Sequence, residues 1–589
     1  MDRPNIVFIM IDDLGWRDTG CFGSTFYETP NIDKLSEEGM RFTNAYAAAP
    51  ICSPTRASLF SGKYPARLGL TNWIGAQQLH GRSICAPNGT CLPLEEYSLA
   101  KAFKEGGYAT YHVGKWHLGP EEFFPEHHGF DNNIGGCHWG SPKHGYFSPY
   151  NNPKLKDGPK GEYLTDRLTS DAIQLIKQSQ DKPFFLHLAY YSVHTPIQCP
   201  SEEEKYFKEK AKRLGLDKAV ISEAGERVPI SEHRKDRVVR RLIQSDSKYA
   251  GMIKRLDMNI GRVLKVLDEL NLRDNTIVVF YSDNGGLATC RQLPPTSNVP
   301  LRDGKAWMYE GGLRVNLIIS WPPKIGQNIV SEIPLNTPDF YPTLLELANL
   351  PSRPDQHVDG VSFASVLRGN SEKDLEQRPL FFHFPHYHSC GSRPFSSVIC
   401  DQFKLIEFLD SGNVELYDLR TDISEERDLA LELPTKAANL LDTLQKWRQK
   451  VDAKLPTPNP LWPQCLYEDF LALSHPLVLN DENEACLEMP ISPDNPTLYT
   501  IPLTEFLEDY YGMKASLELQ SKKFWGTFTT NKESHVMWKT NDEPPQRISE
   551  MLTEMIGKQV FVRIWSEKPG DMQERTAYIQ IKEGFDPFL

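Results

Sequence analysis

The stretch Pro4-Asn-Ile-Val-Phe-Ile-Met-Ile-Asp-Asp13 joins a continuous apolar run, residues 5–11, to two carboxylates. A run of this length and composition predicts a strand that is buried on both faces, as in a parallel sheet. Open α/β sheets form their ligand sites beyond the carboxyl ends of such strands. Adjacent acidic residues are also common in solvated turns, so Asp12 and Asp13 alone leave both interpretations open.

Strand-like runs alternate with helical patterns from this stretch to about residue 370. We expect strands at 109–113, 184–189, 276–281 and 315–320, and helices at 31–39, 98–107, 165–180 and 245–270. Such alternation predicts an α/β domain, here residues 1–375, in which helices cover both faces of a mostly parallel sheet.

After Arg378 the pattern changes to short strands separated by turn residues. Runs at 381–384, 396–400, 403–408 and 414–417, followed by a helix at 437–451, predict a small antiparallel subdomain over residues 376–458. The proline-rich stretch 455–463 is typical of a linker. Residues 459–589 are then a linker and C-terminal extension of unknown role, with strands expected at 515–519, 560–565 and 576–581.

The composition is that of an ordinary globular protein, with 589 residues of which 40% are hydrophobic and 24% charged. Its formal net charge is -13, from 78 acidic and 65 basic residues. The long-range field of such a chain would repel nucleic acid. No apolar run has the length of a transmembrane helix. We therefore expect no nucleic-acid partner and no membrane span.

The amino terminus carries no secretory leader, because the first predicted strand begins almost at once. We expect a periplasmic or secreted protein whose leader is absent from this chain, although a cytoplasmic location also fits. Among the eleven cysteines, Cys85 with Cys91 and Cys390 with Cys400 are spaced as loop-closing disulfides would be. Buried reduced thiols are the alternative.

A second pair of oxygen-bearing side chains, Asp283 and Asn284, lies in Ser282-Asp283-Asn284-Gly285-Gly286, directly after the strand expected at 276–281. Asp-Asn-Gly is an ordinary turn sequence, but together with Asp12 and Asp13 it offers hard oxygen ligands from two strand ends. Calcium and magnesium prefer such ligands. Zinc is less favoured, because Cys52 is the only thiol near this group in the expected site.

The string Cys52-Ser-Pro-Thr-Arg-Ala-Ser-Leu-Phe-Ser-Gly-Lys63 contains a cysteine, a proline and an arginine at an expected helix start. Cys-x-Pro-x-Arg alone could be a packed thiol beside a capping turn. The full string, however, resembles the signature of the formylglycine-dependent type I sulfatases, which are arylsulfatase-like members of the alkaline phosphatase superfamily. In that family the cysteine is oxidised to formylglycine by a formylglycine-generating enzyme that reads Ser-Pro-Thr-Arg.

Further motifs resemble the family in the same order along the chain. They are Pro4 to Asp13, Thr29-Pro-Asn-Ile-Asp33, Gly114-Lys-Trp-His-Leu-Gly119, His194-Thr-Pro-Ile-Gln-Cys-Pro200, Tyr281-Ser-Asp-Asn-Gly285, Leu301-Arg-Asp-Gly-Lys305, Thr337-Pro-Asp-Phe-Tyr-Pro-Thr-Leu-Leu345 and the Tyr417-Asp-Leu region. The resemblance extends to about residue 455. It implies an alkaline-phosphatase-like α/β sandwich, with residues 1–375 catalytic and a small C-terminal subdomain.

The resemblance also implies roles for individual residues. One calcium ion would be bound by Asp12, Asp13, Asp283 and Asn284, with the modified Cys52 also facing it. Arg56 would hold the formylglycine side chain. A ring of basic residues would receive the sulfate and handle protons: Lys115, His117, His194 and Lys305.

The chemistry of a sulfate ester fits such a site. Cations and a divalent metal neutralise the charge on the sulfate oxygens while a nucleophile attacks sulfur. A formylglycine hydrate supplies two hydroxyls: one attacks sulfur, and the other later loses its proton and expels sulfate. His117 is the candidate for that deprotonation, and His194 or Lys305 is the candidate for protonating the leaving oxygen.

The substrate is expected to be a sulfated carbohydrate or another small sulfate ester, by analogy with the family. Aromatic and polar side chains in loops and at strand ends could line the pocket: Trp73, His138, Trp139, His144, His383, His386, His388 and Arg393. Two alternatives are a phosphoester or phosphonate hydrolase of the same superfamily and a non-catalytic protein that binds sulfated glycans.

Overall fold

The computed structural model describes residues 3–179, 182–371 and 373–459, and between residues 477 and 580 it describes the backbone of a set of strands. The chain divides into two compact units, Met1–Pro458 and Asn459–Leu589. The finer division at residue 375 and the role of the second unit stay predictions.

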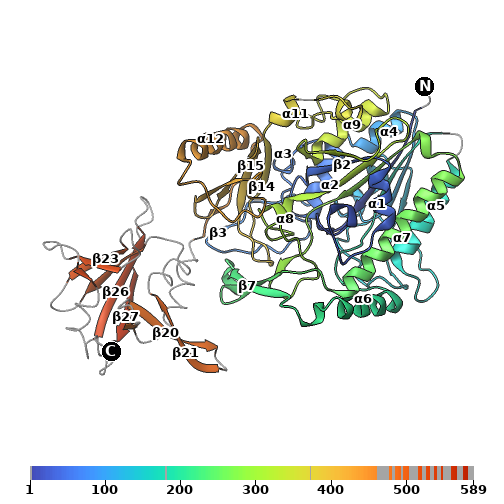
Figure 1. Ribbon diagram of the computed structural model, residues 1–589. Coiled ribbons are helices and arrows are strands. Elements are labelled where there is room, and N and C mark those ends of the chain that lie inside the picture. The colour runs from blue at the N-terminus through green and yellow to red at the C-terminus, as the bar shows by residue number, and fades with distance from the viewer. Residues whose placement is uncertain are drawn as a thin grey trace. The chain divides into compact units, whose positions relative to one another are not determined.

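A nine-stranded mixed sheet forms the centre of the first unit, in the order β12-β2-β11-β9-β1-β6-β4-β5 with β13 beside β2 (Figure 1). Neighbours β9, β1, β6, β4 and β5 are parallel, whereas β11 is antiparallel to both β9 and β2. The strands are β1 (Asn5–Ile11), β2 (Met40–Tyr46), β4 (Ala109–Gly114), β5 (Asn132–Ile134), β6 (Phe184–Ala189), β9 (Thr276–Ser282), β11 (Arg314–Ser320), β12 (Ile329–Ser331) and β13 (Leu335–Asn336).

Helices cover both faces of this sheet (Figure 1). Alternate side chains of β1 point to opposite faces, as in any strand. Ile6 and Phe8 pack in one core with α2, α4 and α9, while Val7 and Ile9 pack in another with α1, α5 and α7. The helices are α1 (Pro30–Glu37), α2 (Cys52–Ser61), α3 (Pro65–Leu68), α4 (Leu99–Glu105), α5 (Leu164–Gln178), α6 (Ser201–Arg213), α7 (Ser247–Glu269), α8 (Glu310–Leu313), α9 (Phe340–Leu347), α10 (Ala364–Leu367) and α11 (Lys373–Gln377).

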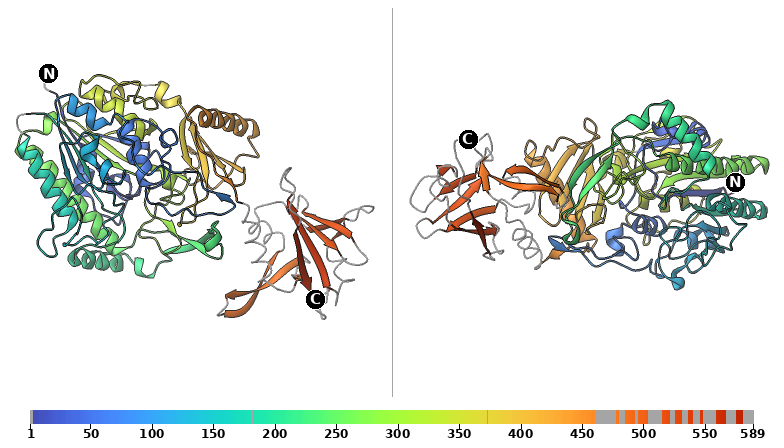
Figure 2. Two further views of the ribbon diagram at one scale, coloured as in Figure 1. Left: turned by 180° about the vertical axis from the view of Figure 1, so that it is seen from behind. Right: turned by 90° about the horizontal axis from the view of Figure 1, so that it is seen from below.

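A four-stranded antiparallel sheet with one helix across it completes this unit (Figure 2). It consists of β14 (Leu380–Phe384), β15 (Phe395–Cys400), β16 (Phe403–Phe408), β17 (Val414–Asp418) and α12 (Pro434–Lys450). One face of the sheet packs on α12, where the rings of Phe381 and Trp447 stack at 4.7 Å. The other face packs against the hydrophobic core that contains Cys52 and Trp307. This small sheet therefore packs beside the start of α2.

Smaller sheets accompany these layers. In the first unit they are β10 (Thr289–Cys290), β8 (Arg237–Arg241) and β7 (Ser222–Arg227), and the pair β3 (Ser83–Ile84) and β18 (Thr457–Pro458). In the second unit they are β19 (Leu477–Leu479), β20 (Ala485–Ser492) and β21 (Asn495–Pro502), and the sheet of β25 (Gln546–Arg547), β24 (Val536–Lys539), β23 (Trp525–Thr530), β22 (Ala515–Gln520), β26 (Gln559–Ser566) and β27 (Arg575–Gln580).

The predicted fold class is confirmed: helices sandwich a mixed, mostly parallel sheet, and an antiparallel sheet follows. Sequence reasoning missed β2, because Arg41, Thr43 and Asn44 interrupt its apolar run. It also did not distinguish the direction of β11, since buried parallel and antiparallel strands have the same composition. Every cysteine in the part of the chain that the structure describes is a free thiol, so neither Cys85 with Cys91 nor Cys390 with Cys400 forms a bridge.

A buried ion-pair cluster joins the antiparallel sheet to α8. The Nζ atom of Lys404 lies 3.0 Å from Glu310 and 2.9 Å from Glu425, and all three side chains are fully buried. Replacing Lys404 by alanine leaves two buried carboxylates without this cation, so we expect the free energy of unfolding of the first unit to fall by about 3–5 kcal/mol. Urea denaturation followed by circular dichroism measures this change.

Lys446→Ala is the matched control, because Lys446 pairs with Asp442 on the exposed face of α12. An exposed pair of this kind contributes about 0.3–0.5 kcal/mol. Equal losses in the two variants would contradict the importance of the buried cluster.

Candidate functional site

Four oxygen-bearing side chains lie where β1 and β9 end side by side. Ile11 pairs in register with Ser282, so the residues that follow each strand meet at the same edge of the sheet. The backbone N–H of Asp13 donates to Asp283 Oδ1 at 3.3 Å, and Asn284 Nδ2 donates to Asp13 Oδ1 at 2.8 Å. Asp12, Asp13, Asp283 and Asn284 are all buried.

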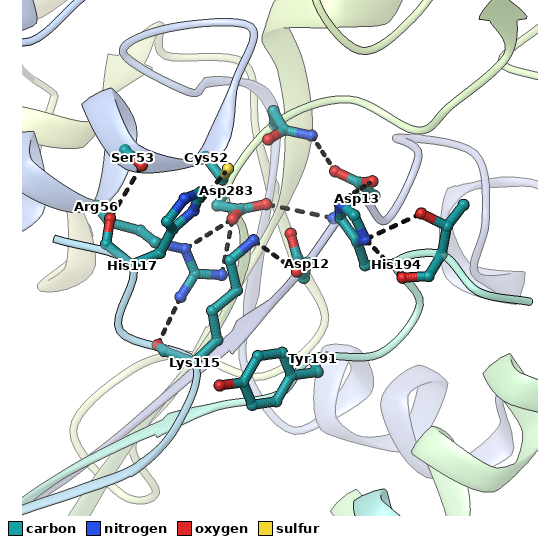
Figure 3. A network of polar contacts seen from close by, with 12 residues as sticks. Asp12, Asp13, Cys52, Ser53, Arg56, Lys115, His117, Tyr191, His194 and Asp283 are labelled. Atoms are coloured by element: carbon teal, nitrogen blue, oxygen red, sulfur yellow. Dashed lines mark hydrogen bonds and ion pairs between the residues drawn. The ribbon is translucent and has the colours of Figure 1, made fainter. Parts of the chain in front are cut away.

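Each of the three carboxylates is paired with a buried cation from another element, and Figure 3 shows the pairs of Asp12 with Lys115 and of Asp283 with Arg56. The ion pairs are Lys115 Nζ to Asp12 Oδ2 at 2.7 Å, Lys305 Nζ to Asp13 Oδ1 at 2.8 Å, and Arg56 Nη2 to Asp283 Oδ2 at 2.7 Å. Arg56 also donates from Nη1 to the backbone carbonyl of Lys115 at 3.0 Å. The helix α2 and the segment after β4 are thereby tied to the acidic residues.

Two oxygens in this group remain without a hydrogen-bond partner. They are Asp12 Oδ1 and Asn284 Oδ1, both buried. Asp12, Asp13 and His194 also bring one potential ligand atom each to within 4.8 Å of one another. Unsatisfied hard oxygens beside two carboxylates suit a divalent cation such as calcium or magnesium.

The electrostatics of the acids agree with that fit. Burial raises the pKa of Asp12 to about 8, with Lys115 opposing the shift and Asp283 and Asp13 adding to it. Burial acts in the same sense on Asp13, but Lys305, His194 and Lys115 hold the pKa of Asp13 below its ordinary value. A bound cation is the kind of charge that keeps both carboxylates ionised.

Cys52 begins α2 and faces His117. Its Sγ lies 3.3 Å from His117 Nδ1, and the cysteine is 3% exposed. His117 Nε2 lies 3.1 Å from the carbonyl oxygen of Ile74, which can only accept, so Nε2 carries the proton and Nδ1 presents its lone pair to Cys52. Burial, and next Lys115, hold the pKa of His117 well below its usual range, so the ring is neutral.

His194 and Lys305 approach the acids from another side (Figure 3 shows His194). His194 Nδ1 donates to the carbonyl of Thr195 at 2.9 Å, and its Nε2 lies 3.5 Å from Asp13 Oδ2. Burial, followed by Lys305, lowers the pKa of His194 to about 3. Burial would lower the pKa of Lys305, but Asp13 raises it above the ordinary value, so the ammonium is charged at neutral pH.

The structure brings together all the residues that the sequence predicted for the metal site and the basic ring. They are Asp12, Asp13, Cys52, Arg56, Lys115, His117, His194, Asp283, Asn284 and Lys305. The side chains proposed to line the pocket divide into two groups. The first group is associated with this site. The ring of Trp73 lies 6.2 Å from that of His117, and the charges of Lys305 and Asp13 act on the pKa of His388. Trp139 and His144, whose rings contact each other, belong to the segment after β5.

The remaining pocket candidates make other contacts. His383 contacts Ser396 and the Lys454 carbonyl, His386 contacts Thr71, and Arg393 pairs with Asp410. The ring of His138 stacks on Phe124 and is exposed. These contacts place His383, His386 and Arg393 in the packing of the antiparallel sheet and its loops, and their role in the pocket stays a prediction.

Sequence reasoning missed the groups that orient His117. The Ile74 carbonyl sets which nitrogen is protonated, and the backbone N–H of His117 donates to the Cys137 carbonyl at 3.0 Å. Gly140 packs directly on the ring: a Cβ there would lie 2.5 Å from His117 Cε1. Backbone carbonyls and a lone glycine leave no recognisable pattern in a single sequence.

Comparison with known proteins gives concordant matches. The family model described as Sulfatase matches residues 4–350, and that described as N-sulphoglucosamine sulphohydrolase, C-terminal, matches residues 303–452. A sulfatase of Formosa agariphila is 32% identical over 541 residues, covering 78% of this chain and 90% of the relative. Human N-acetylgalactosamine-6-sulfatase is 31% identical over 408 residues, covering 64% and 68%.

Among solved structures, Ps i-CgsB in complex with k-i-k-neocarrahexaose has a TM-score of 0.61 at 27% identity, covering 80% of this chain and 98% of that chain. The first family match contains every residue of the site, from Asp12 to Lys305.

Gly140 offers a test of the packing around His117. The added methyl group of Gly140→Ala would force the His117 ring to move, and we expect a loss of about 1–3 kcal/mol in the free energy of unfolding, as for overpacking elsewhere. Gly326→Ala is the control, because there the new Cβ meets only the far end of the Ile329 side chain. Thermal denaturation of both variants measures the difference, and an unchanged midpoint for Gly140→Ala would contradict the close contact.

Proposed function

The chain belongs to the sulfatase family and is a hydrolase of sulfate esters, and from this premise we propose that it releases inorganic sulfate from a sulfated carbohydrate through a formylglycine derived from Cys52, with one calcium ion in the site. The observation that carries the proposal is the position of Cys52. Its side chain faces the three buried carboxylates and their cations, and it lies 3.3 Å from a neutral histidine.

An unmodified thiol is poorly suited to the reaction. Burial raises the pKa of Cys52 above its ordinary value, and the thiol form is a weak nucleophile. A formylglycine-generating enzyme would replace the CH₂SH group by an aldehyde, whose hydrate offers two hydroxyls at the same position. Cys52 begins α2 and Arg56 lies one turn further along, so the arginine can hold a hydroxyl of the hydrate while it stays paired with Asp283.

His117 is the proposed base for the step that re-forms the aldehyde. Its Nδ1 lone pair points at the side chain of residue 52, because Nε2–H is committed to the Ile74 carbonyl. A neutral imidazole in hydrogen-bond reach can accept the proton of the remaining hydroxyl as sulfate leaves.

Lys115 and Lys305 are the proposed partners of the sulfate oxygens. Both ammonium groups are buried against the carboxylates of the site and can also contact an anion placed between them. On the leaving-group side, Lys305 and His194 are the candidate proton donors. Lys305 is the better donor in the geometry observed, because its charge is maintained by Asp13.

Calcium fits the oxygen ligands that Asp12, Asp13, Asp283 and Asn284 offer, with the modified Cys52 beside them. When bound, it would supply positive charge toward the sulfate oxygens. The carbohydrate substrate is supported by the names of the relatives, among them N-acetylgalactosamine-6-sulfatase. None of the helices in the described ranges is both long and apolar enough to cross a membrane. A periplasmic or secreted location remains part of the proposal, because an enzyme in these compartments has access to polymeric sulfated sugars.

The nucleophile is tested by mass spectrometry of protein produced with a formylglycine-generating enzyme. We expect the peptide that carries Cys52 to lose about 18 Da, because an aldehyde replaces the thiol. Cys52→Ala should lower the rate of sulfate release from 4-nitrophenyl sulfate and sulfated sugars by about 10³-fold or more. Cys21→Ala, which removes a thiol whose side-chain contact is with Thr19, should keep the activity.

The alternatives give different results in the same experiment. Unmodified Cys52 with full hydrolysis of phosphate or phosphonate esters would favour a phosphoryl-transfer enzyme. A modified Cys52 with no turnover of any sulfate ester, but with binding of a sulfated glycan, would favour a non-catalytic binding protein.

The metal site is tested by stability. We expect Ca²⁺ at 100 times its Kd to raise the free energy of unfolding of the metal-free protein by about 2.7 kcal/mol. Asn284→Ala should weaken or remove this stabilisation, since it deletes a buried oxygen ligand. Asp442→Asn on the exposed face of α12 should leave the calcium effect unchanged. Stabilisation that persists in Asn284→Ala and disappears in Asp442→Asn would place the ion elsewhere.

A further inference from the structure

A stretch without acidic residues follows β5 and lies beside the site. Residues 132–156 contain no Asp or Glu, although the whole chain has a net charge of -13. The stretch carries five basic side chains: His138, Lys143, His144, Lys154 and Lys156. Such a local excess of positive charge in an acidic protein favours binding of an anion rather than general solubility.

Two of these side chains, Lys143 and His144, occupy the tip of a tight turn. The backbone N–H of Gly145 donates to the carbonyl of Pro142 at 2.8 Å, which makes Lys143 and His144 the two central residues. Both side chains are exposed. Gly145 has a φ of 88°, a conformation that glycine adopts without strain, so the sequence supports this turn.

The segment around the turn is attached to both histidines of the site. On one side the Cys137 carbonyl accepts from the backbone N–H of His117, and Gly140 packs on its ring. On the other side Tyr146 donates through its hydroxyl to the carbonyls of Tyr191 and His194, at 2.6 and 2.8 Å.

Figure 3 shows His117 and His194 on opposite sides of the carboxylates. Residues 137–146 therefore pass from one histidine to the other, and the turn lies between the two attachments.

The ring of Trp139 packs against both side chains of the turn. Its indole is 8% exposed, the Nζ atom of Lys143 lies 5.5 Å from the ring centroid, and the ring of His144 lies at 5.7 Å. Among the residues that the structure describes, Lys143 makes no ion pair, whereas Lys154 in the same stretch pairs with Glu126 at 2.6 Å. The charge of Lys143 is thus held in place by an aromatic ring and not neutralised by an acid.

We propose that the turn Pro142–Gly145 binds a second anionic group of the substrate, a carboxylate or a further sulfate, through Lys143 with His144 beside it. The inference rests on the proposed function and extends it to a polyanionic saccharide. Lys143 is three positions along the chain from Gly140, which packs on the His117 ring, so the Cα atoms of Lys143 and Gly140 lie at most about 10 Å apart. The second anion therefore belongs to the sugar that carries the scissile sulfate or to its immediate neighbour.

Binding to protein with Cys52→Ala tests this inference without turnover. The probes are two pairs that differ in one anionic group: glucosamine 6-sulfate with glucosamine 2-N,6-O-disulfate, and N-acetylgalactosamine 6-sulfate with the disaccharide in which a hexuronate is attached to it. We expect the more highly charged member of at least one pair to bind about tenfold more tightly by calorimetry. Adding Lys143→Ala should remove that preference and change the affinity for the singly sulfated sugar less than twofold.

Lys265→Ala is the matched control, since it removes an exposed lysine from the outer surface of α7. Equal affinities within both pairs, including no binding of any probe, would overturn the inference. So would a preference that survives Lys143→Ala, or one that Lys265→Ala removes equally, because the effect would then be general electrostatic attraction.

A separate measurement distinguishes failure of this inference from failure of the proposed function. Protein with a modified Cys52 is assayed for sulfate release from the same four sugars. Turnover without a charge preference overturns only the anion site at the turn. A charge preference that depends on Lys143, without release of sulfate from any sugar, overturns only the proposed hydrolysis.

Discussion

Three buried ion pairs at one edge of the central sheet are the constraint on which the rest of the structure depends. Asp12, Asp13 and Asp283 follow parallel strands, and a sheet that carried these carboxylates alone would lose several kcal/mol per buried charge. Each is balanced by a cation that a different element supplies. The positions of α2, of the segment after β4 and of the loop before α8 are therefore set by charge as well as by apolar packing.

The pairing of these carboxylates with cations still leaves oxygens that could bind a ligand. Three carboxylates and three basic side chains cancel formally, so the site has little net charge of its own. Asp12 Oδ1 and Asn284 Oδ1 are nevertheless buried and without partners, an arrangement that stability alone does not favour. A divalent cation bound at these oxygens would satisfy them and would make the site positive. With that cation bound, a sulfate monoester, which carries one negative charge, would be attracted without the excess of cations that a doubly charged phosphate ester would favour.

Much of this site could be predicted because its residues are adjacent to strong local patterns. The apolar run of β1 predicts a buried strand, and its end then places Asp12 and Asp13 at the carboxyl edge; β9 does the same for Asp283 and Asn284. The motif around Cys52 is recognisable from residue types alone. The direction of a buried strand is not encoded in its residue types, so the antiparallel course of β11 was not predicted. The strand β2 was not predicted because nearly half of its residues are polar.

The orientation of the reactive groups depends on irregular segments and their backbone. The proton positions on His117 and His194 are set by the carbonyls of Ile74 and Thr195, and every residue has a carbonyl. Parallel strands and α2 thus supply charges of the site, while the segments near Ile74 and from Cys137 to Tyr146 orient its histidines. Loops can vary while the strands that support them are retained. The two segments near Ile74 and from Cys137 to Tyr146 are therefore where variation could change specificity without removing the charged centre.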